Sequence, residues 1–278
     1  MVNRLERAKI AQEHNKKMLE KYPSQIIKCS VNTKTFFDDE TNDFNDGKEV
    51  NVTDVYKNYT NPIQNKITLL DMDTVSAIIE INKQRKNNER ICALNFASYK
   101  HPGGGFLHGS MAQEEALCHE SILFNILKDF TDYYSWNSWH LNNNLYTNRA
   151  LFTPDVLFLR NDKIYYCDVI TCAAPNKGAA KQYKGISDED NSKALKSRCR
   201  FILDVAEARD VDVLILGAFG CGVFEQDPKE VADTFLELLK NYVFKEVVFA
   251  VPSKINGKNN RNYNIFKKEI EKIKTRYE

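Results

Sequence analysis

Short apolar runs alternate with helical patterns from about residue 66 to the end of the chain. Apolar runs of strand length lie at 67–70, 91–96, 156–160, 164–171, 213–216 and 247–251. Apolar residues at helical spacing occupy about 73–86, 112–130, 192–209, a stretch from 227, and another around 266–277. Strands that alternate with helices favour a sheet covered by helices on both faces. The pattern therefore predicts a three-layer α/β domain.

The stretch from 213 to 230 marks this alternation most clearly. Val213-Leu214-Ile215-Leu216 is apolar at every position, as a central strand buried on both faces should be. Further on, Asp227-Pro228-Lys229-Glu230 combines a capping box with a proline at the first helical position. We therefore expect a buried strand, a glycine-rich connection and then a helix that begins at Pro228.

The first 65 residues have a different pattern. Residues 4–22 place apolar side chains at helical spacing, and Pro23 should end that helix. Residues 33–62 are polar and rich in Asn and Asp, with short extended pieces at 35–37 and 50–52. We expect residues 1–65 to form a helix and a loop-rich extension packed on the core, and residues 66–278 to form the main domain.

Charge, cysteine content and hydrophobicity exclude several classes of protein. Lys and Arg number 39 against 38 Asp and Glu, so no global field points to nucleic acid or a membrane surface. No apolar run approaches the roughly 20 residues of a membrane helix. Seven scattered cysteines favour a reduced compartment, so we expect a cytoplasmic protein. Cys167 and Cys172 lack zinc-knuckle spacing, and we expect no metal and no cofactor.

Two glycine-rich stretches follow strands of the expected sheet. Pro102-Gly103-Gly104-Gly105 comes shortly after strand 91–96, and the stretch 217–224 comes directly after strand 213–216. Ligands of open α/β sheets bind beyond the carboxyl ends of strands, where glycines let backbone N–H groups approach phosphate oxygens. Neither stretch fits a P-loop or a dinucleotide fingerprint. Two such turns indicate a ligand with a diphosphate, although each could also be a tight turn of purely structural origin.

An acidic pair opens the helix that begins near residue 112. Glu114 and Glu115 lie shortly after the triple glycine, so we expect them to face the same cleft. Acidic residues in a first turn otherwise complement the helix dipole and face water. Adjacent helix residues point about 100° apart, so the two carboxylates should not flank one glycosidic bond in the usual way. We expect one to act on a bond and the other to bind a sugar hydroxyl.

Several ordered motifs resemble those of the microbial-type poly(ADP-ribose) glycohydrolases. The resemblance spans about residues 66–252 and is strongest at Asn95-Phe96-Ala97-Ser98, Pro102-Gly103-Gly104-Gly105-Phe106 and Gln113-Glu114-Glu115. Further similar stretches are 153–156 with Arg160, 169–171 with 174–176, and 216–224 with Asp227-Pro228. The chain departs from the family at His101, where asparagine is frequent. The resemblance implies a macrodomain-like fold, in which a mixed sheet lies between helices.

The resemblance also implies roles for individual residues. Glu115 would be the catalytic acid and base, Glu114 would hold a ribose hydroxyl, and Gln113 would support the site. The triple glycine would lie along the distal ribose and diphosphate, and the second glycine turn would cradle the diphosphate. The expected substrate-binding residues are therefore Asn95, Gly103, Gly104, Gly105, Phe106, Gln113, Gly220, Cys221, Gly222, Val223 and Phe224.

The implied reaction is hydrolysis of the ribose–ribose bond of poly(ADP-ribose), from chain ends, with release of ADP-ribose by a monomer. Glu115 would start protonated and protonate the leaving oxygen, and its carboxylate would then activate water. Burial, Glu114 and the bound diphosphate would favour the protonated form, against the helix N-terminus. Three alternatives remain: hydrolysis of mono-ADP-ribose from protein or nucleic acid, a non-catalytic ADP-ribose reader, and a nucleotide-binding regulator, which would leave the glutamate pair unexplained.

Other candidates have structural alternatives. Cys221 could be a nucleophile, but a small packing residue is the simpler interpretation. His108 could line the cleft or face solvent, and His119, one turn after Glu115, could contact it or pack. Tyr99 and Phe106 could stack on adenine or pack in the core. We expect the charged stretch 177–190 to be a solvated loop.

Overall fold

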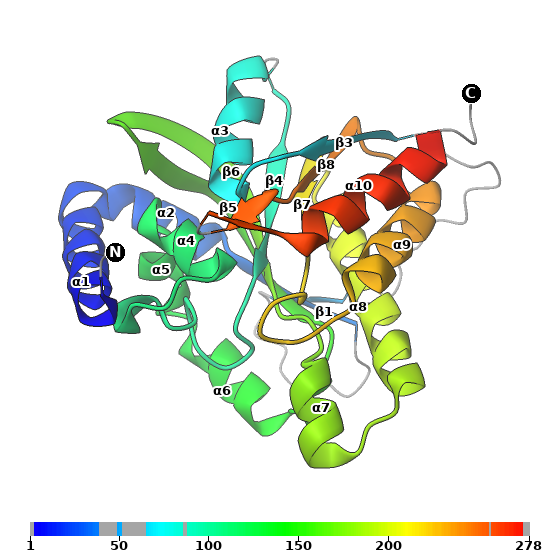
Figure 1. Cartoon of the computed structure of the whole chain (residues 1–278). Coiled ribbons are helices and arrows are strands. Elements are labelled where there is room, and N and C mark those ends of the chain that lie inside the picture. The colour runs from blue at the N-terminus through cyan, green and yellow to red at the C-terminus, as the bar shows by residue number, and fades with distance from the viewer. Residues whose placement is uncertain (1–2, 39–48, 52–64, 86–87, 256, 275–278) are drawn as a thin grey trace.

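The computed structural model describes residues 3–38, 49–51, 65–85, 88–255 and 257–274 (Figure 1). An eight-stranded mixed sheet has the order β2-β1-β5-β6-β4-β7-β8-β3. Its strands are β1 (Lys34–Phe37), β2 (Glu49–Asn51), β3 (Lys66–Leu70), β4 (Ile91–Phe96), β5 (Arg149–Arg160), β6 (Lys163–Cys172), β7 (Val213–Leu216) and β8 (Glu246–Ala250). The five strands from β6 to β3 are parallel, whereas β5 is antiparallel to both of its neighbours.

Helices cover both faces of this sheet, which confirms the three-layer α/β fold. One layer contains α8 (Asp188–Ala208), α9 (Pro228–Leu238) and α10 (Arg261–Lys274). The opposite layer contains α1 (Arg4–Lys21), α2 (Pro23–Asn32), α3 (Thr74–Gln84), α4 (Gln113–His119), α5 (Leu123–Leu127) and α6 (Thr131–Trp139). Strand β4 serves both layers: Cys92 and Leu94 pack on the first, and Ile91 and Ala93 on the second. This alternation is the two-residue period of a strand buried on both faces.

The expected helix 112–130 is wrong as a single element. It is two short helices, α4 and α5, separated by a break at 120–122. At the break the backbone pairs with β5: Leu157 O accepts from Ile122 N at 3.1 Å, and Glu120 O accepts from Leu159 N at 2.7 Å. β1 pairs with β5 only at residues 149–152. Farther along that edge, the backbone N–H and C=O groups of β5 are therefore available to the segment at the break. Strand pairing therefore replaces the hydrogen bonds of a continuous helix.

The predicted end of the first helix is confirmed, since α1 ends at Lys21. Pro23 then occupies the first position of α2, where its missing N–H costs nothing. One further local expectation is wrong. The expected loop 177–190 is instead largely helical: α8 already begins at Asp188, and residues 177–184 form helix α7 (Lys177–Lys184). Asn176 caps the start of α7 by accepting from Ala179 N. Gly185, in the left-handed conformation, ends it. The charged residues thus lie on a short capped helix.

The N-terminal segment contributes to the sheet as well as to the helical layer. β1 pairs with β5 in antiparallel register and with β2 in parallel register, which accounts for the extended pieces near 35–37 and 50–52. Residues 39–48 and 52–64 lie outside the described part, so a division at residue 65 stays a prediction. Within the part that the structure describes, no helix is long and apolar enough to span a membrane.

Candidate active site

The two glycine turns lie side by side because the strands that lead into them are neighbours. β4 and β7 are parallel and directly paired, so their carboxyl ends lie at the same edge of the sheet. Gly103, Gly104 and Gly220 all have positive φ, at 65°, 59° and 72°, which other residues adopt at a cost. Helix α4 begins at the same edge, so both glycine turns and the acidic pair lie together.

Gln113 fixes the start of α4 to the end of β4. Its Oε1 accepts a hydrogen bond from Phe96 N at 2.8 Å. Its Nε2 donates to Leu94 O at 2.8 Å and to Thr74 Oγ1 at 3.1 Å. With its amide fully engaged by the protein, Gln113 is a positioning residue that holds the helix bearing the acidic pair.

Glu114 is buried at the base of the site, with 2% of its surface exposed. Its Oε2 accepts from Ser98 N at 2.7 Å, and its Oε1 accepts from Asn95 Nδ2 at 3.2 Å. Burial raises the pKa of this carboxyl to about 8, against the lowering effect of these hydrogen bonds, and Glu115 raises it further. Glu114 is therefore protonated at neutral pH.

Glu115 lies against the triple-glycine turn, with 6% of its surface exposed. Its Oε1 accepts from Gly105 N at 2.8 Å, and its Oε2 accepts from Ala112 N at 2.9 Å. A side chain on Gly104 would place its Cβ 2.7 Å from Glu115 Oε1 and 3.0 Å from Glu114 Oε2. The two carboxyl groups thus converge over Gly104, a closer approach than the helical spacing alone suggested.

The cleft beside these carboxyls has two arms. The carboxylate arm, of about 690 Å³, is lined by both glutamates, Gly104, Gly105 and Ser98, and farther out by Arg4, His101, Leu107 and His108. The apolar arm, of about 370 Å³, lies between the start of α4, the second glycine turn and residues from 250–255 and 260–262. The two arms adjoin each other, since both are lined by Phe96, Ala112, Val223 and Phe224.

Most, but not all, of the residues expected in the site line this cleft. Gly220, Gly222, Val223 and Phe224 line the apolar arm, as expected of the second turn. Phe106 does not reach either arm: it is 1% exposed, and its ring packs against Phe124 and His119. The turn that follows the triple glycine directs this ring into the core, so its assignment to the substrate is wrong.

Three further residues expected in the site do not line either arm: Asn95, Gly103 and Cys221. Asn95 is fully buried and acts through Glu114. A Cβ on Gly103 would lie 2.6 Å from the Phe124 ring, so this glycine lets the turn pack closely. Cys221 Sγ contacts Phe219 O, and burial raises the pKa of the thiol to about 12, which argues against a nucleophile.

The remaining candidates divide between packing and the cleft. Tyr99 stacks on Tyr146 at 4.1 Å, and His119 packs edge-on against Phe106, so both are packing residues. His108 lines the carboxylate arm and is also exposed. Sequence reasoning missed Arg4, from α1, and a group near the C-terminus (Pro252, Ile255, Asn260 and Asn262), because no motif links them to the glycine turns. Among the described residues no cluster of His, Cys, Asp or Glu is arranged to hold a metal ion.

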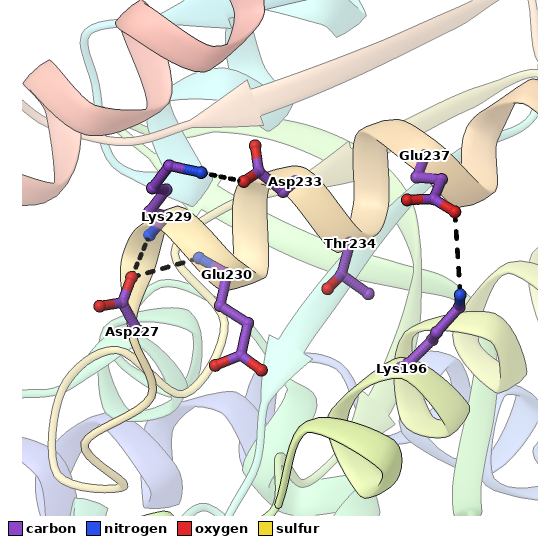
Figure 2. A pocket seen from close by; sticks show the side chains of 7 residues that line it. All are labelled: Lys196, Asp227, Lys229, Glu230, Asp233, Thr234 and Glu237. Carbon is purple, nitrogen blue, oxygen red and sulfur yellow. Dashed lines mark hydrogen bonds and ion pairs between the residues drawn. The ribbon is translucent and has the colours of Figure 1, made fainter. Parts of the chain in front are cut away.

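A separate hollow lies on the outer side of α8 and α9 (Figure 2). Both of its lysines are paired: Lys229 with Asp233 along α9, and Lys196 of α8 with Glu237 of α9. Asp227 caps α9 by accepting from the N–H groups of Lys229 and Glu230, which confirms the predicted helix start. This hollow shares no lining residue with the glycine turns and is not a candidate active site.

Comparison with known proteins gives a family and similar structures. The sequence matches the family described as "Microbial-type PARG, catalytic domain" over residues 10–161. The poly(ADP-ribose) glycohydrolase of Thermomonospora curvata, bound to the inhibitor ADP-HPD, is 26% identical with a TM-score of 0.79, covering 95% of this chain and 99% of that one. The Deinococcus radiodurans enzyme in complex with ADP-ribose is 29% identical with a TM-score of 0.75, covering 89% and 98%. No curated protein matches the sequence.

Proposed function

This chain belongs to the microbial-type PARG family, and we infer from that membership and from the site that it is a poly(ADP-ribose) glycohydrolase. It hydrolyses the O-glycosidic bond between two riboses and releases ADP-ribose. Similar structures with ADP-ribose or ADP-HPD bound support ADP-ribose as the ligand of the cleft. The catalytic proposal rests on the position of Glu115. Its carboxyl group lies against the triple-glycine turn, where it accepts a hydrogen bond from Gly105 N.

The shape of the cleft suggests how ADP-ribose would lie in it. The apolar arm suits an adenine, because it is lined mainly by apolar side chains and by backbone. The second glycine turn borders both arms and would place backbone N–H groups along the diphosphate. Only the carboxylate arm is lined by Glu115, so the distal ribose and its scissile bond would lie there.

We assign the acid and base steps to Glu115. In its protonated form it donates a proton to the oxygen that leaves with the acceptor ribose, while positive charge develops at C1 of the distal ribose. The resulting carboxylate then takes a proton from water as the water oxygen bonds to C1. A neutral Glu114 avoids repulsion between two buried anions and leaves its hydroxyl available to a ribose oxygen.

The assignment to Glu115 is tested by Glu115→Gln, because glutamine cannot exchange a proton. We expect kcat for release of ADP-ribose from poly(ADP-ribose) to fall by roughly 10²–10⁴-fold, the usual contribution of general acid–base catalysis. ADP-ribose binding, measured by calorimetry, should persist. Glu230→Gln is a matched control, because Glu230 also occupies the first turn of a helix but lies outside the cleft. Near wild-type turnover in Glu115→Gln would rule out the role.

The linkage is tested with three substrates: poly(ADP-ribose), mono-ADP-ribosylated protein and ADP-ribosylated DNA. Release of ADP-ribose from the polymer alone supports the ribose–ribose bond as the target. Release from a mono-ADP-ribosylated substrate would favour another linkage. Binding of ADP-ribose without release from any of the three would identify a reader.

Three finer points belong to the proposal. We propose cleavage from chain ends, a monomer, and a cytoplasmic location. The location is supported by the cysteines, all seven of which are free thiols. Size-exclusion chromatography with light scattering tests the monomer, and the length distribution of the remaining polymer distinguishes cleavage at ends from internal cleavage.

A further inference from the structure

The carboxylate arm continues beyond the two glutamates to a group of basic residues. Arg4, His101 and His108 line this outer part, together with apolar contacts from Leu107 and Pro102. The acidic side chains that line the arm are Glu114 and Glu115, and backbone N–H groups already bind their oxygens. The outer part of the arm is therefore basic and adjoins the bond-breaking position.

Arg4 reaches this position from a distant part of the sequence. It is the first residue of α1, which packs against the turn 106–109 that follows the triple glycine. Arg4 Nε donates to His108 O at 3.0 Å. This is the only hydrogen bond or ion pair of the Arg4 side chain among the described residues, so the two terminal nitrogens of its guanidinium group remain available. Those two nitrogens match the geometry of a phosphate.

The orientation of the substrate assigns an occupant to this outer part, and this step rests on the proposed function. ADP-ribose fills the apolar arm and extends to Glu115, so whatever leaves the distal ribose must lie farther along the carboxylate arm. In poly(ADP-ribose) the leaving group is the next ADP-ribose unit, which carries its own diphosphate. Guanidinium and imidazole groups are suitable partners for that anion.

We propose that Arg4, assisted by His101 and His108, binds the diphosphate of the departing ADP-ribose unit. The site makes the enzyme favour a polymer over an ADP-riboside with a small uncharged leaving group. Arg4 is a binding residue for the leaving group and takes no part in the proton transfers of Glu115.

The test compares two substrates in the full-length protein: di(ADP-ribose) and a 4-nitrophenyl ADP-riboside of the same anomeric configuration. Only the first has a leaving group with a diphosphate. Arg4→Gln should lower the ratio of the two kcat/KM values, dimer over aryl riboside, about tenfold, as loss of one charge-assisted hydrogen bond does. Arg4→Lys should reduce this ratio less than Arg4→Gln does, because lysine keeps the positive charge but lacks the paired N–H donors of the guanidinium group.

Two controls separate binding from support of the turn. Lys9→Gln removes a positive charge from an exposed position of α1 outside the cleft and should leave the ratio unchanged. Arg7→Gln removes the hydrogen bond from Arg7 Nε to Gly109 O, at 2.9 Å, and should affect both substrates equally. The effect of Arg4→Gln should also shrink as ionic strength rises.

The outcomes are distinct. An equal loss on both substrates in Arg4→Gln, like that of Arg7→Gln, would show that Arg4 only supports the turn through His108 O and would overturn the proposal. Unchanged kcat/KM values for both substrates in Arg4→Gln would overturn it as well, while the proposed function would stand. If the wild-type protein cleaved the aryl riboside but not the dimer, the proposed function would fail together with this inference.

Discussion

Gly104 is subject to two independent constraints at the level of a single residue. Its φ of 59° is left-handed, which disfavours any residue with a Cβ. The space above its Cα is also occupied, since a Cβ would lie 2.7 Å from Glu115 Oε1. The first constraint affects the stability of the turn, and the second affects the position of the carboxyl group that acts on the bond.

These two constraints can be separated by substitution. Gly104→Ala should lower kcat by roughly 100-fold, because a catalytic group displaced by about 1 Å loses about that much. Gly185→Ala is the matched control: its φ is 63°, but nothing lies within 4 Å of the added Cβ. Both variants should lose about 1 kcal/mol of unfolding free energy. If Gly104→Ala kept the kcat of Gly185→Ala, the close contact with Glu115 would be disproved.

The residues of the site differ in how far sequence alone identified them. Glu114, Glu115 and the glycines were found because they form short motifs next to predicted strands. Phe106 was misplaced because a motif gives spacing but not the direction of a ring, which here turns toward Phe124. Arg4 was missed because its approach depends on how α1 packs on a turn about one hundred residues later.

At the level of elements, the break between α4 and α5 is held by an ion pair. Arg160, at the end of β5, donates from Nε and Nη2 to the two carboxylate oxygens of Glu120. It also donates to Ser76 Oγ in α3 at 2.8 Å. The pair therefore joins a strand end, a helix break and a neighbouring helix. A periodicity that continues into α5 conceals such a break in the sequence.

Removal of this pair should cost more than removal of a pair within one helix. Arg160→Met should lower the unfolding free energy by about 1 kcal/mol, since the pair is bidentate but about a third exposed and partly screened by solvent. Lys83→Met removes an exposed pair with Glu80 inside α3 and should cost less than Arg160→Met, because exposed ion pairs contribute little to stability. Urea unfolding of both variants measures the difference. Equal losses would mean that Arg160 does not hold the break.

At the level of the whole molecule, strand order brings the site together, and only part of that order could be predicted. Parallel strands that alternate with helices place both glycine turns at one edge, whichever strands are neighbours. The sequence did not indicate that β4 and β7 are adjacent, nor that β1 from the N-terminal extension joins β5. Those pairings depend on contacts between distant segments, which local patterns do not encode.

Burial of carboxyl groups has a consequence for the stability of the whole chain. Burial raises the pKa of Glu114 to about 8 and that of Asp204 to about 6, so the folded state holds protons that the unfolded chain releases at lower pH. For Glu114, the unfolded value is 4.5. The stability contribution of such a group is fully present below pH 4.5 and is lost as pH rises to about 8.

The unfolding free energy of the wild-type protein should therefore fall relative to that of Glu114→Gln as pH rises from 6 to 9. The difference between the two proteins should change by about 2 to 3 kcal/mol over this range, since glutamine does not titrate. Glu80→Gln is a suitable control, because hydrogen bonds from Gln84 and Lys83 lower the pKa of Glu80 and leave it ionised throughout. Urea unfolding at several pH values gives all three curves. Parallel curves for wild type and Glu114→Gln would show that Glu114 is ionised in the folded protein at neutral pH. The proposal that Glu114 is uncharged beside Glu115 would then fail.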